Sequence, residues 1–362
     1  MSQIPAEIKE LPVIELEGNF KEMGRQFGEA SRAKINELYE VRLETALKHA
    51  ADRGRTYTKE EALTIAGGNL TILKEYCEDI YEETLGIAEG SGLSLSQIFI
   101  LQGLTDFRDY LSWGKIADGF GCTALCIPQE KSETGSMIMA QNWDLTTSNM
   151  PYVCFVKRKP QKGPETYSLT VYGGLSMIGL NSEGIAIGTT NIKTTDTRPG
   201  VHYLNIIHKV MSCSTIKEAE ESILKAPRSG AHFYMIADSK GSFKGFECSA
   251  LKHAEMPLKS GSLNHCNHIL DPGLKILEAE DMGPSTCQRQ IRIDQLIDRP
   301  SFSLAGIKEI LSDHDGDQLA ICRHDVGEGI STNGSVIIEP QTGTIHACRS
   351  YPHEGIWQKF TF

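Results

Sequence analysis

The 362-residue sequence has no apolar run of the roughly 18 residues that a membrane span requires. Residues 1–9 also lack a basic segment followed by an apolar core, the pattern of a secretory signal. Basic residues are the minority, with 36 Lys and Arg against 47 Asp and Glu and a net charge of −11, and they are dispersed. We therefore expect a soluble cytoplasmic protein that binds neither membrane nor nucleic acid.

The ten cysteines form no repeated short spacing. Cys122 and Cys126 are separated by three residues, but no second close pair completes a Cys-only zinc site. In a reducing compartment we expect most of the cysteines to be small buried hydrophobic residues.

Internal repeats, low-complexity tracts and linkers are also missing from the sequence. The hydrophobic content of 40% and the charged content of 23% are ordinary for a globular protein. The length allows one large domain or two smaller ones, and we expect helices and strands to share one core.

The first third of the chain has mainly helical patterns. After a strand at 11–18, Asn19 is the expected cap of a long helix, and Thr58 and Ser94 open later ones. The expected helices cover residues 20–51, 58–66, 70–88 and 94–113.

The pattern changes after Cys122 to short segments rich in β-forming residues. Asn181 to Gly184 predicts a hairpin turn, because Asn and Gly tolerate the positive φ angles of a tight turn. Helices are expected at 202–211, 216–224, 285–296 and 304–311, and strands at 122–127, 136–141, 152–156, 166–172, 177–180, 185–189, 232–237, 243–247, 335–339 and 344–348.

The hexapeptide DGFGCT, residues 118–123, lies at the boundary between the two patterns. A thiol nucleophile needs a base, and no histidine is near Cys122 in the sequence. Breaking the Gly121–Cys122 bond would give Cys122 a free α-amine with a reference pKa of about 7.7–8.0, which can serve as that base. Taken alone, however, the hexapeptide favours a buried strand cysteine that follows an ordinary glycine turn.

The residues around Cys122 suit such a cleavage. Gly119 and Gly121 have no β-carbon, so the thiol can approach the preceding carbonyl, and Thr123 could assist with hydrogen bonds. A hairpin would bring Asp144 back beside Cys122. The later segment 264–268 offers amide groups that could donate to an oxyanion.

An ordered set of motifs over nearly the whole chain resembles the isopenicillin N acyltransferase family, also called the acyl-CoA:6-aminopenicillanic acid acyltransferase family, which are N-terminal nucleophile (Ntn) hydrolases. The motifs, in chain order, are GNFKEMGRQFGEASRAKI, AEGSGLS, DGFGCT, QNWD, IGLNSEGIAIGTTN, CNHIL, STCQRQIR and SDHDGDQLAICRH.

The resemblance implies a role for each matching residue. Cys122 would be both the self-processing group and the mature nucleophile, and Asp144 would orient the freed amine. Asn267 matches the oxyanion-hole asparagine, with Asn191 as a second donor, and Arg289 matches a basic residue near the nucleophile. Arg323 is carried over on weaker grounds, because the loop before it varies.

Each of these residues also has a plainer interpretation. Asp144 could cap a turn, Asn267 could satisfy buried backbone groups, and Arg289 could be a solvated charge on a helix. His265, Cys266 and His268 look like a metal cluster, but alternating strand residues point to opposite faces. The acidic segment 313–317 resembles a calcium loop without its closing Glu, and is better interpreted as the end of a helix.

Two departures from the family limit the analogy. Related bile-salt and penicillin V hydrolases have an arginine where this chain has Gln141, so their contact with a substrate carboxylate is not assumed here. The fungal acyltransferase ends in a peroxisomal tripeptide, whereas this chain ends in Phe360, Thr361 and Phe362, which favours the cytoplasm.

By resemblance, the expected fold is α+β, the four-layer αββα sandwich of the Ntn hydrolases. The helical segment 1–121 and the catalytic segment 122–362 become two associated chains after self-cleavage. The expected function is a Cys122 amidohydrolase or acyltransferase that acts on small N-acyl amides or acyl thioesters, with water or an amine as acceptor. No cofactor or metal is required, acyl-CoA is a conceivable substrate, and an oligomer is left open. The alternative is an uncleaved, inactive homologue that serves as a binding or scaffold protein.

Overall fold

The computed structural model describes residues 5–112, 121–279, 283–316, 319–325, 327 and 329–362. The first part of the chain is helical, as its pattern predicts, apart from one edge strand. Its elements are α1 (Ala6–Lys9), β1 (Val13–Gly18), α2 (Phe20–Ala30), α3 (Arg32–Ala51), α4 (Lys59–Gly68), α5 (Leu70–Tyr76), α6 (Glu78–Ser91) and α7 (Leu95–Ser112).

Two of the predicted long helices are divided. The helix expected at 20–51 breaks at Ser31, whose φ of −122° lies outside the helical region, and the helix expected at 70–88 breaks at extended Cys77. The predicted caps at Asn19 and Thr58 are confirmed, since each side chain accepts a hydrogen bond from the backbone N–H three residues later.

The rest of the chain builds two sheets. The larger, eight-stranded sheet includes β1 at its edge, parallel to β4. Its strands, in spatial order, are β1, β4 (Val153–Pro160), β5 (Thr166–Val171), β6 (Ile178–Asn181), β7 (Ala186–Asn191), β8 (His232–Ala237), β9 (Phe243–Cys248) and β10 (His253–Glu255). The predicted hairpin turn between β6 and β7 is confirmed, with Gly184 at a φ of +81°.

The second sheet has six strands and carries Cys122. In spatial order they are β11 (Leu263–His265), β2 (Gly121–Ile127), β3 (Ile138–Thr146), β12 (Ile330–Glu339), β13 (Thr344–Arg349) and β14 (Gln358–Thr361). β2 and β3 form the predicted hairpin, and Asp144 is the register partner of Gly121.

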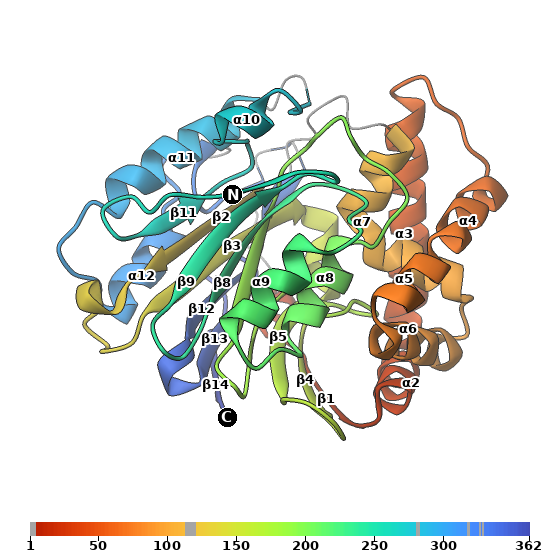
Figure 1. The fold of residues 1–362 in the computed structure, drawn as a ribbon, viewed down its shortest axis with the longest axis horizontal. Helices are drawn as coiled ribbons and strands as arrows, with labels where there is room; N and C mark the ends of the chain where they lie inside the picture. The colour runs from red at the N-terminus through yellow and green to blue at the C-terminus, as the bar shows by residue number, and fades with distance from the viewer. Residues whose placement is uncertain (1–4, 113–120, 280–282, 317–318, 326, 328) are drawn as a thin grey trace.

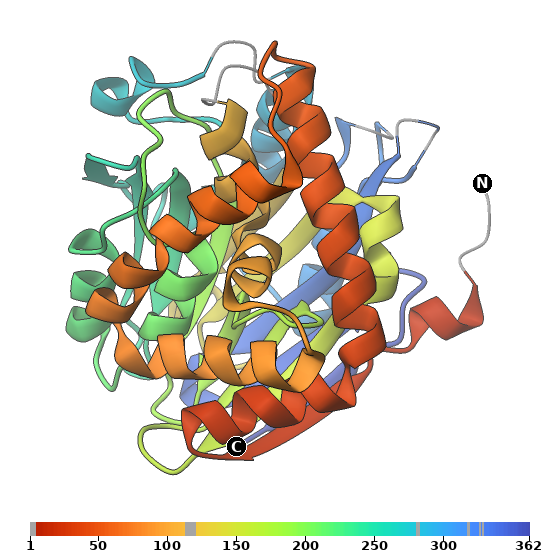
Figure 2. The same cartoon turned by 90° about the vertical axis from the view of Figure 1, so that its right-hand side faces the viewer.

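The two sheets stack face to face, with helices on both outer sides. The helical segment and α8 (Tyr203–Val210) and α9 (Ile216–Leu224) cover the larger sheet, whereas α11 (Pro284–Leu296) and α12 (Leu304–Leu311) lie on the opposite side (Figures 1 and 2). The short helix α10 (Pro272–Lys275) and 3₁₀ turns at Gln129–Lys131, Thr147–Tyr152 and Pro340–Thr342 complete the described elements. This is the expected αββα sandwich.

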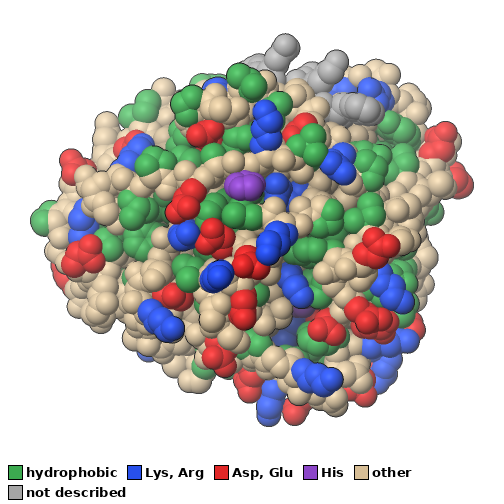
Figure 3. Space-filling model, viewed as in Figure 1, with side chains coloured by type: hydrophobic (Ala, Val, Ile, Leu, Met, Phe, Trp, Pro, Cys, Tyr) green, Lys and Arg blue, Asp and Glu red, His purple; other side chains and the backbone are tan. Residues whose placement is uncertain are grey.

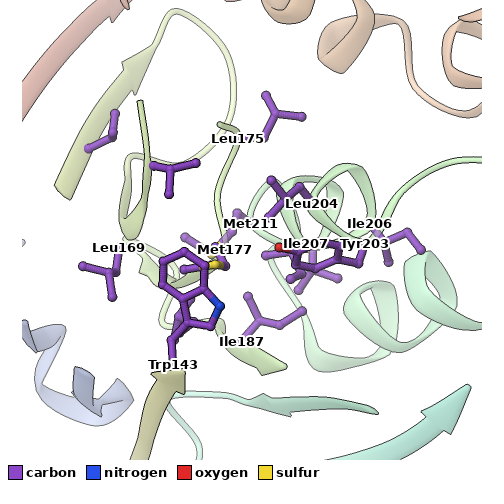
Figure 4. Packing of buried hydrophobic residues seen from close by; sticks show 14 of the residues in the cluster. Trp143, Leu169, Leu175, Met177, Ile187, Tyr203, Leu204, Ile206, Ile207 and Met211 are labelled. Atoms are coloured by element: carbon purple, nitrogen blue, oxygen red, sulfur yellow. The ribbon is translucent and has the colours of Figure 1, made fainter. Parts of the chain in front are cut away.

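A continuous apolar core joins the helices to both sheets. Trp143 of β3 projects from the smaller sheet towards Met177 and Ile187 of the larger one (Figure 4). A second core lies between the smaller sheet and α11 and α12, and includes Leu125 and Ile293. On the face shown in Figure 3, acidic and basic side chains are interspersed rather than separated into patches.

No single helix of the described chain is long and apolar enough to cross a bilayer, although the bent pair α6 and α7 meets those criteria together. The ten cysteines are free, and all but Cys287 are buried, as expected of small hydrophobic residues.

Candidate active site

Cys122 is the second residue of β2, and its side chain faces the core between the two sheets. Alternation along this strand puts Cys122, Ala124 and Cys126 in the inter-sheet core, while Leu125 and Ile127 pack towards α11 and α12. The backbone of Cys122 therefore lies between two differently built layers. The larger sheet is on its thiol side, and α11 is on the other.

The backbone of Cys122 is held on both sides of its Cα. Its N–H donates to Oδ1 of Asn267 over 2.7 Å, and Nη1 of Arg289 donates to its carbonyl oxygen. Nη2 of Arg289 also donates to Oδ1 of Asn267 over 2.9 Å. Since both groups are donors, the amide oxygen of Asn267 must face them, and its Nδ2 donates instead to the carbonyl of Asn191 over 2.8 Å.

Asp144 lies opposite Gly121 and is buried. Its Oδ1 accepts a hydrogen bond of 2.7 Å from Oγ1 of Thr332, while its Oδ2 has no hydrogen-bond partner within the described chain. The β12 register shifts at Asn333, and this bulge directly follows the Thr332 that contacts Asp144. The site thus contains a positioned carboxylate with one oxygen still available.

Gly121 occupies a position where a side chain would have to displace its neighbours. A β-carbon there would lie 2.8 Å from Nη2 of Arg289 and 3.2 Å from Oδ2 of Asp144. Glycine therefore permits Arg289 and Asp144 to flank the Gly121–Cys122 bond closely.

The electrostatics of the uncut chain keep the thiol protonated. Burial raises the pKa of the Cys122 thiol to about 12, and the charge of Asp144 adds to the increase. Arg289 and the backbone N–H groups of Asp144 and Asn191 oppose it. Burial also raises the pKa of Asp144, against the charges of Arg289 and Arg323 and the hydrogen bond from Thr332.

The structure brings the remaining sequence-predicted residues to the same place. Thr123 accepts a hydrogen bond of 3.2 Å from Nη1 of Arg289 through its Oγ1. Arg323 is buried, and its positive charge opposes the rise in the pKa of Asp144. The alternative that Arg289 is a solvated helix charge is wrong, because its side chain is buried against β2. Asp118, Gly119 and Phe120 lie outside the described residues.

Gln141, where an arginine is expected in the related bile-salt and penicillin V hydrolases, binds the backbone of β7. Its Oε1 accepts from the Thr189 N–H over 2.9 Å, and its Nε2 donates to the Thr189 carbonyl over 2.5 Å. Pairing between β6 and β7 ends at Ile187, so the Gln141 amide takes the place of a neighbouring strand at Thr189. It thereby joins the two sheets.

Sequence reasoning missed two residues that position the site. Thr332 binds Asp144, and Oγ1 of Thr286 accepts from the Asn267 N–H over 2.7 Å. Both are single threonines far from Cys122 in the sequence. Thr286 belongs to the STCQRQIR motif, but nothing in that motif singles it out, and Thr332 lies outside the family motifs. Their role follows only from the packing of β12 and α11 around β2.

His265, Cys266 and His268 do not converge on a common point. His265 lies 2.9 Å from Glu247 through Nε2, His268 contacts Thr286, and Cys266 belongs to the core under α11. These contacts agree with the interpretation of His265, Cys266 and His268 as structural residues rather than a metal cluster. The segment 313–316 follows α12, as expected of a helix end.

Comparisons with known proteins agree with this geometry. The sequence model of the "Acyl-coenzyme A:6-aminopenicillanic acid acyl-transferase" family matches residues 130–353, more than half of the chain. The acyl-coenzyme A:6-aminopenicillanic-acid-acyltransferase 40 kDa form of Emericella nidulans is 23% identical over 313 residues, which cover 86% of this chain and 84% of the fungal protein.

Two solved structures are more distant. A mutant of the conjugated bile acid hydrolase of Clostridium perfringens has 14% identity and a TM-score of 0.44, covering 67% of this chain and 97% of the hydrolase. Penicillin V acylase of Agrobacterium tumefaciens has 12% identity and a TM-score of 0.40, covering 62% of this chain and 82% of the acylase.

The family match and the similarity to the fungal acyltransferase therefore place the chain among the acyltransferase-type enzymes. The chain belongs to the acyl-coenzyme A:6-aminopenicillanic acid acyl-transferase family.

Proposed function

We propose that the chain is a self-processing enzyme in which Cys122 first cleaves its own Gly121–Cys122 bond and then carries small acyl groups. The observation that carries this proposal is the set of polar groups that surround the Gly121–Cys122 bond. Asn267 binds the Cys122 nitrogen, Arg289 binds the Cys122 carbonyl, and Asp144 and Arg289 flank Gly121. A merely structural cysteine would also need partners for its buried backbone groups, but it would not require a buried arginine and a buried carboxylate beside the preceding residue.

Self-processing would begin with attack of the Cys122 sulfur on the Gly121 carbonyl carbon. The C–N bond breaks, the nitrogen leaves as an amine that takes up the thiol proton, and a thioester joins Gly121 to the sulfur. Water then hydrolyses the thioester to the Gly121 carboxylate and a free thiol. The small size of Gly121 supports this route, because the attack requires a close approach.

Cleavage would change the base available to the thiol. The uncut chain has a Cys122 pKa of about 12, so little thiolate exists near neutral pH. The freed α-amine, with a reference pKa of about 7.7–8.0, would lie on the same residue as the thiol. The unpartnered Oδ2 of Asp144 could then accept a hydrogen bond from this amine.

Catalysis would transfer an acyl group in two steps. The thiol attacks the carbonyl of an amide or thioester while the α-amine accepts and returns the proton, and the acyl-enzyme then passes its acyl group to water or an amine. In the uncut chain, Nδ2 of Asn267 donates to Asn191. Asn267 could therefore donate to an oxyanion only if its hydrogen bond to the Asn191 carbonyl breaks after cleavage.

Intact-mass measurement tests self-processing directly. The purified wild-type protein should give two masses that divide the chain between Gly121 and Cys122, and Cys122→Ala should give a single uncut mass. Cys126→Ala is the matched control, because Cys126 is buried on the same strand and faces the same core. Cys126→Ala should therefore be cleaved like the wild type.

An uncut wild-type protein without activity would contradict the proposal and support the alternative of a binding or scaffold homologue. A panel of acyl-CoA donors and N-acyl amides then separates the two reactions. Release of product without an added amine indicates a hydrolase. If the free thiol of CoA appears only when an amine is added, the hydrolase version is wrong and the enzyme is a transferase.

A further inference from the structure

Three histidines from separate parts of the chain meet at the surface of the protein, apart from Cys122. His314 follows α12, His324 lies in the segment before β12, and His353 lies between β13 and β14. One nitrogen from each ring lies within 4.8 Å of the other two. Among the described residues, this is the group of His, Cys, Asp and Glu whose atoms are placed to hold a metal ion.

The spacing of the rings fits a shared ion. The three ring centroids are 5.1, 5.0 and 5.0 Å apart, so they form a nearly equilateral triangle. Tetrahedral zinc with nitrogen ligands at about 2.0–2.1 Å would place imidazole centres roughly 5 Å apart and ligand nitrogens about 3.3 Å apart. Small rotations of the side chains would close the remaining gap.

Other contacts prepare the ligands. Nδ1 of His314 donates to the carbonyl of Ser312 over 2.9 Å, which leaves the lone pair on its Nε2. The Sγ of Cys322 lies 3.8 Å from Nδ1 of His353 but is not part of the group whose ligand atoms all lie within 4.8 Å of one another. Imidazole nitrogens are ligands that zinc binds well.

The cluster is open to solvent, and His353 makes no hydrogen bond to the neighbouring Glu354. Burial and the proximity of His314 lower the pKa of His353. Its Nε2 lies 3.9 Å from Glu354, beyond hydrogen-bond distance. His314 and His353 are exposed while His324 is buried, so an ion can enter from solvent.

We propose that His314, His324 and His353 bind one zinc ion that has a structural role, with a water molecule from the exposed side as the fourth ligand. Cys322 and His324 flank Arg323, whose positive charge stabilises the ionised form of Asp144. The ion would therefore fix the short segment that places Arg323, and it would join this segment to the chain after α12 and to the chain after β13.

Cobalt(II) is the probe for this site, because it replaces zinc and absorbs visible light. Tag-free protein is stripped of metal with a chelator and titrated with cobalt. Wild type should develop visible bands that saturate at a single ion per chain and disappear when zinc is added. His314→Ala/His353→Ala should lose these bands, whereas His253→Ala, which removes an exposed histidine on β10, should keep them.

The effect of zinc on thermal stability is a second readout. Zinc should raise the Tm of wild type and His253→Ala but not that of the double variant, and circular dichroism verifies that all variants fold. Absence of saturable binding in wild type, or equal binding in the double variant, would overturn the site. These readouts do not depend on cleavage or activity at Cys122.

Discussion

Arg289 shows how one side chain can organise an entire site. From the first half of α11 it reaches the Cys122 carbonyl, Thr123 and Asn267. Burial of a guanidinium is expensive unless its donors are satisfied, and its fixed fork of donors is what makes such multiple contacts possible. The opposite side of this arrangement is Gly121, which has to remain small.

The first prediction concerns that small residue. Gly121→Ala places a β-carbon 2.8 Å from Nη2 of Arg289, so the guanidinium or β2 must move. Because a displacement of about 1 Å can cost roughly 100-fold in rate, self-cleavage should slow by at least that factor. The measurement is the rate at which the two fragment masses appear after synthesis.

Gly68→Ala is its control, because nothing lies within 4 Å of the position that a β-carbon would take at Gly68. This variant should be processed at the wild-type rate. Cleavage of Gly121→Ala at the wild-type rate would show that the close packing of Arg289 around Gly121 is unnecessary for the reaction.

At the scale of elements, the sequence predicted the features that depend on residues close together in the chain. Strand alternation and the β2–β3 hairpin fix the places of Cys122 and Asp144, because a two-strand register follows from local sequence. Thr332 and the three clustered histidines could not be predicted this way. They meet through the packing of segments far apart in the chain, which no local periodicity encodes.

The break of the expected helix at Ser31 has a related cause. Gly24 and Gly28 of α2 and Gly86 and Gly90 of α6 let the two helix backbones touch. A β-carbon at Gly86 would lie 2.1 Å from the carbonyl oxygen of Lys21. Tertiary contact between α2 and α6, rather than helix propensity, thus sets the direction of α2.

The second prediction tests this contact. Ala in place of a helical Gly normally stabilises by about 0.5–1 kcal/mol, but Gly86→Ala should destabilise by at least ~1–3 kcal/mol because it forces the helices apart. Urea unfolding measures the difference. Gly68→Ala on α4 is again the control and should show the normal small gain. Equal effects of the two substitutions would contradict close contact between α2 and α6.

At the scale of the whole molecule, the buried thiols make the free energy of unfolding depend on pH. Burial raises the pKa of Cys266 to about 11 and those of Cys248 and Cys348 to about 12, from an ordinary value of 9.0. A raised folded-state pKa means that the native state holds its proton longer than the unfolded chain. The contribution of these thiols is therefore complete below about pH 8.5–9 and is lost as the pH rises towards 11–12.

The third prediction follows from that sign. Each buried thiol should lower the free energy of unfolding by up to about 1.4 kcal/mol per pH unit above pH 9. In urea unfolding between pH 7 and 10.5, Cys248→Ala should reduce this slope by about one proton. Cys287→Ala removes the exposed cysteine and is the control that should leave the slope unchanged, because this side chain already contacts solvent in the folded chain. Identical slopes for both variants would mean that the core admits the thiolate of Cys248, which its position between β8 and β10 opposes.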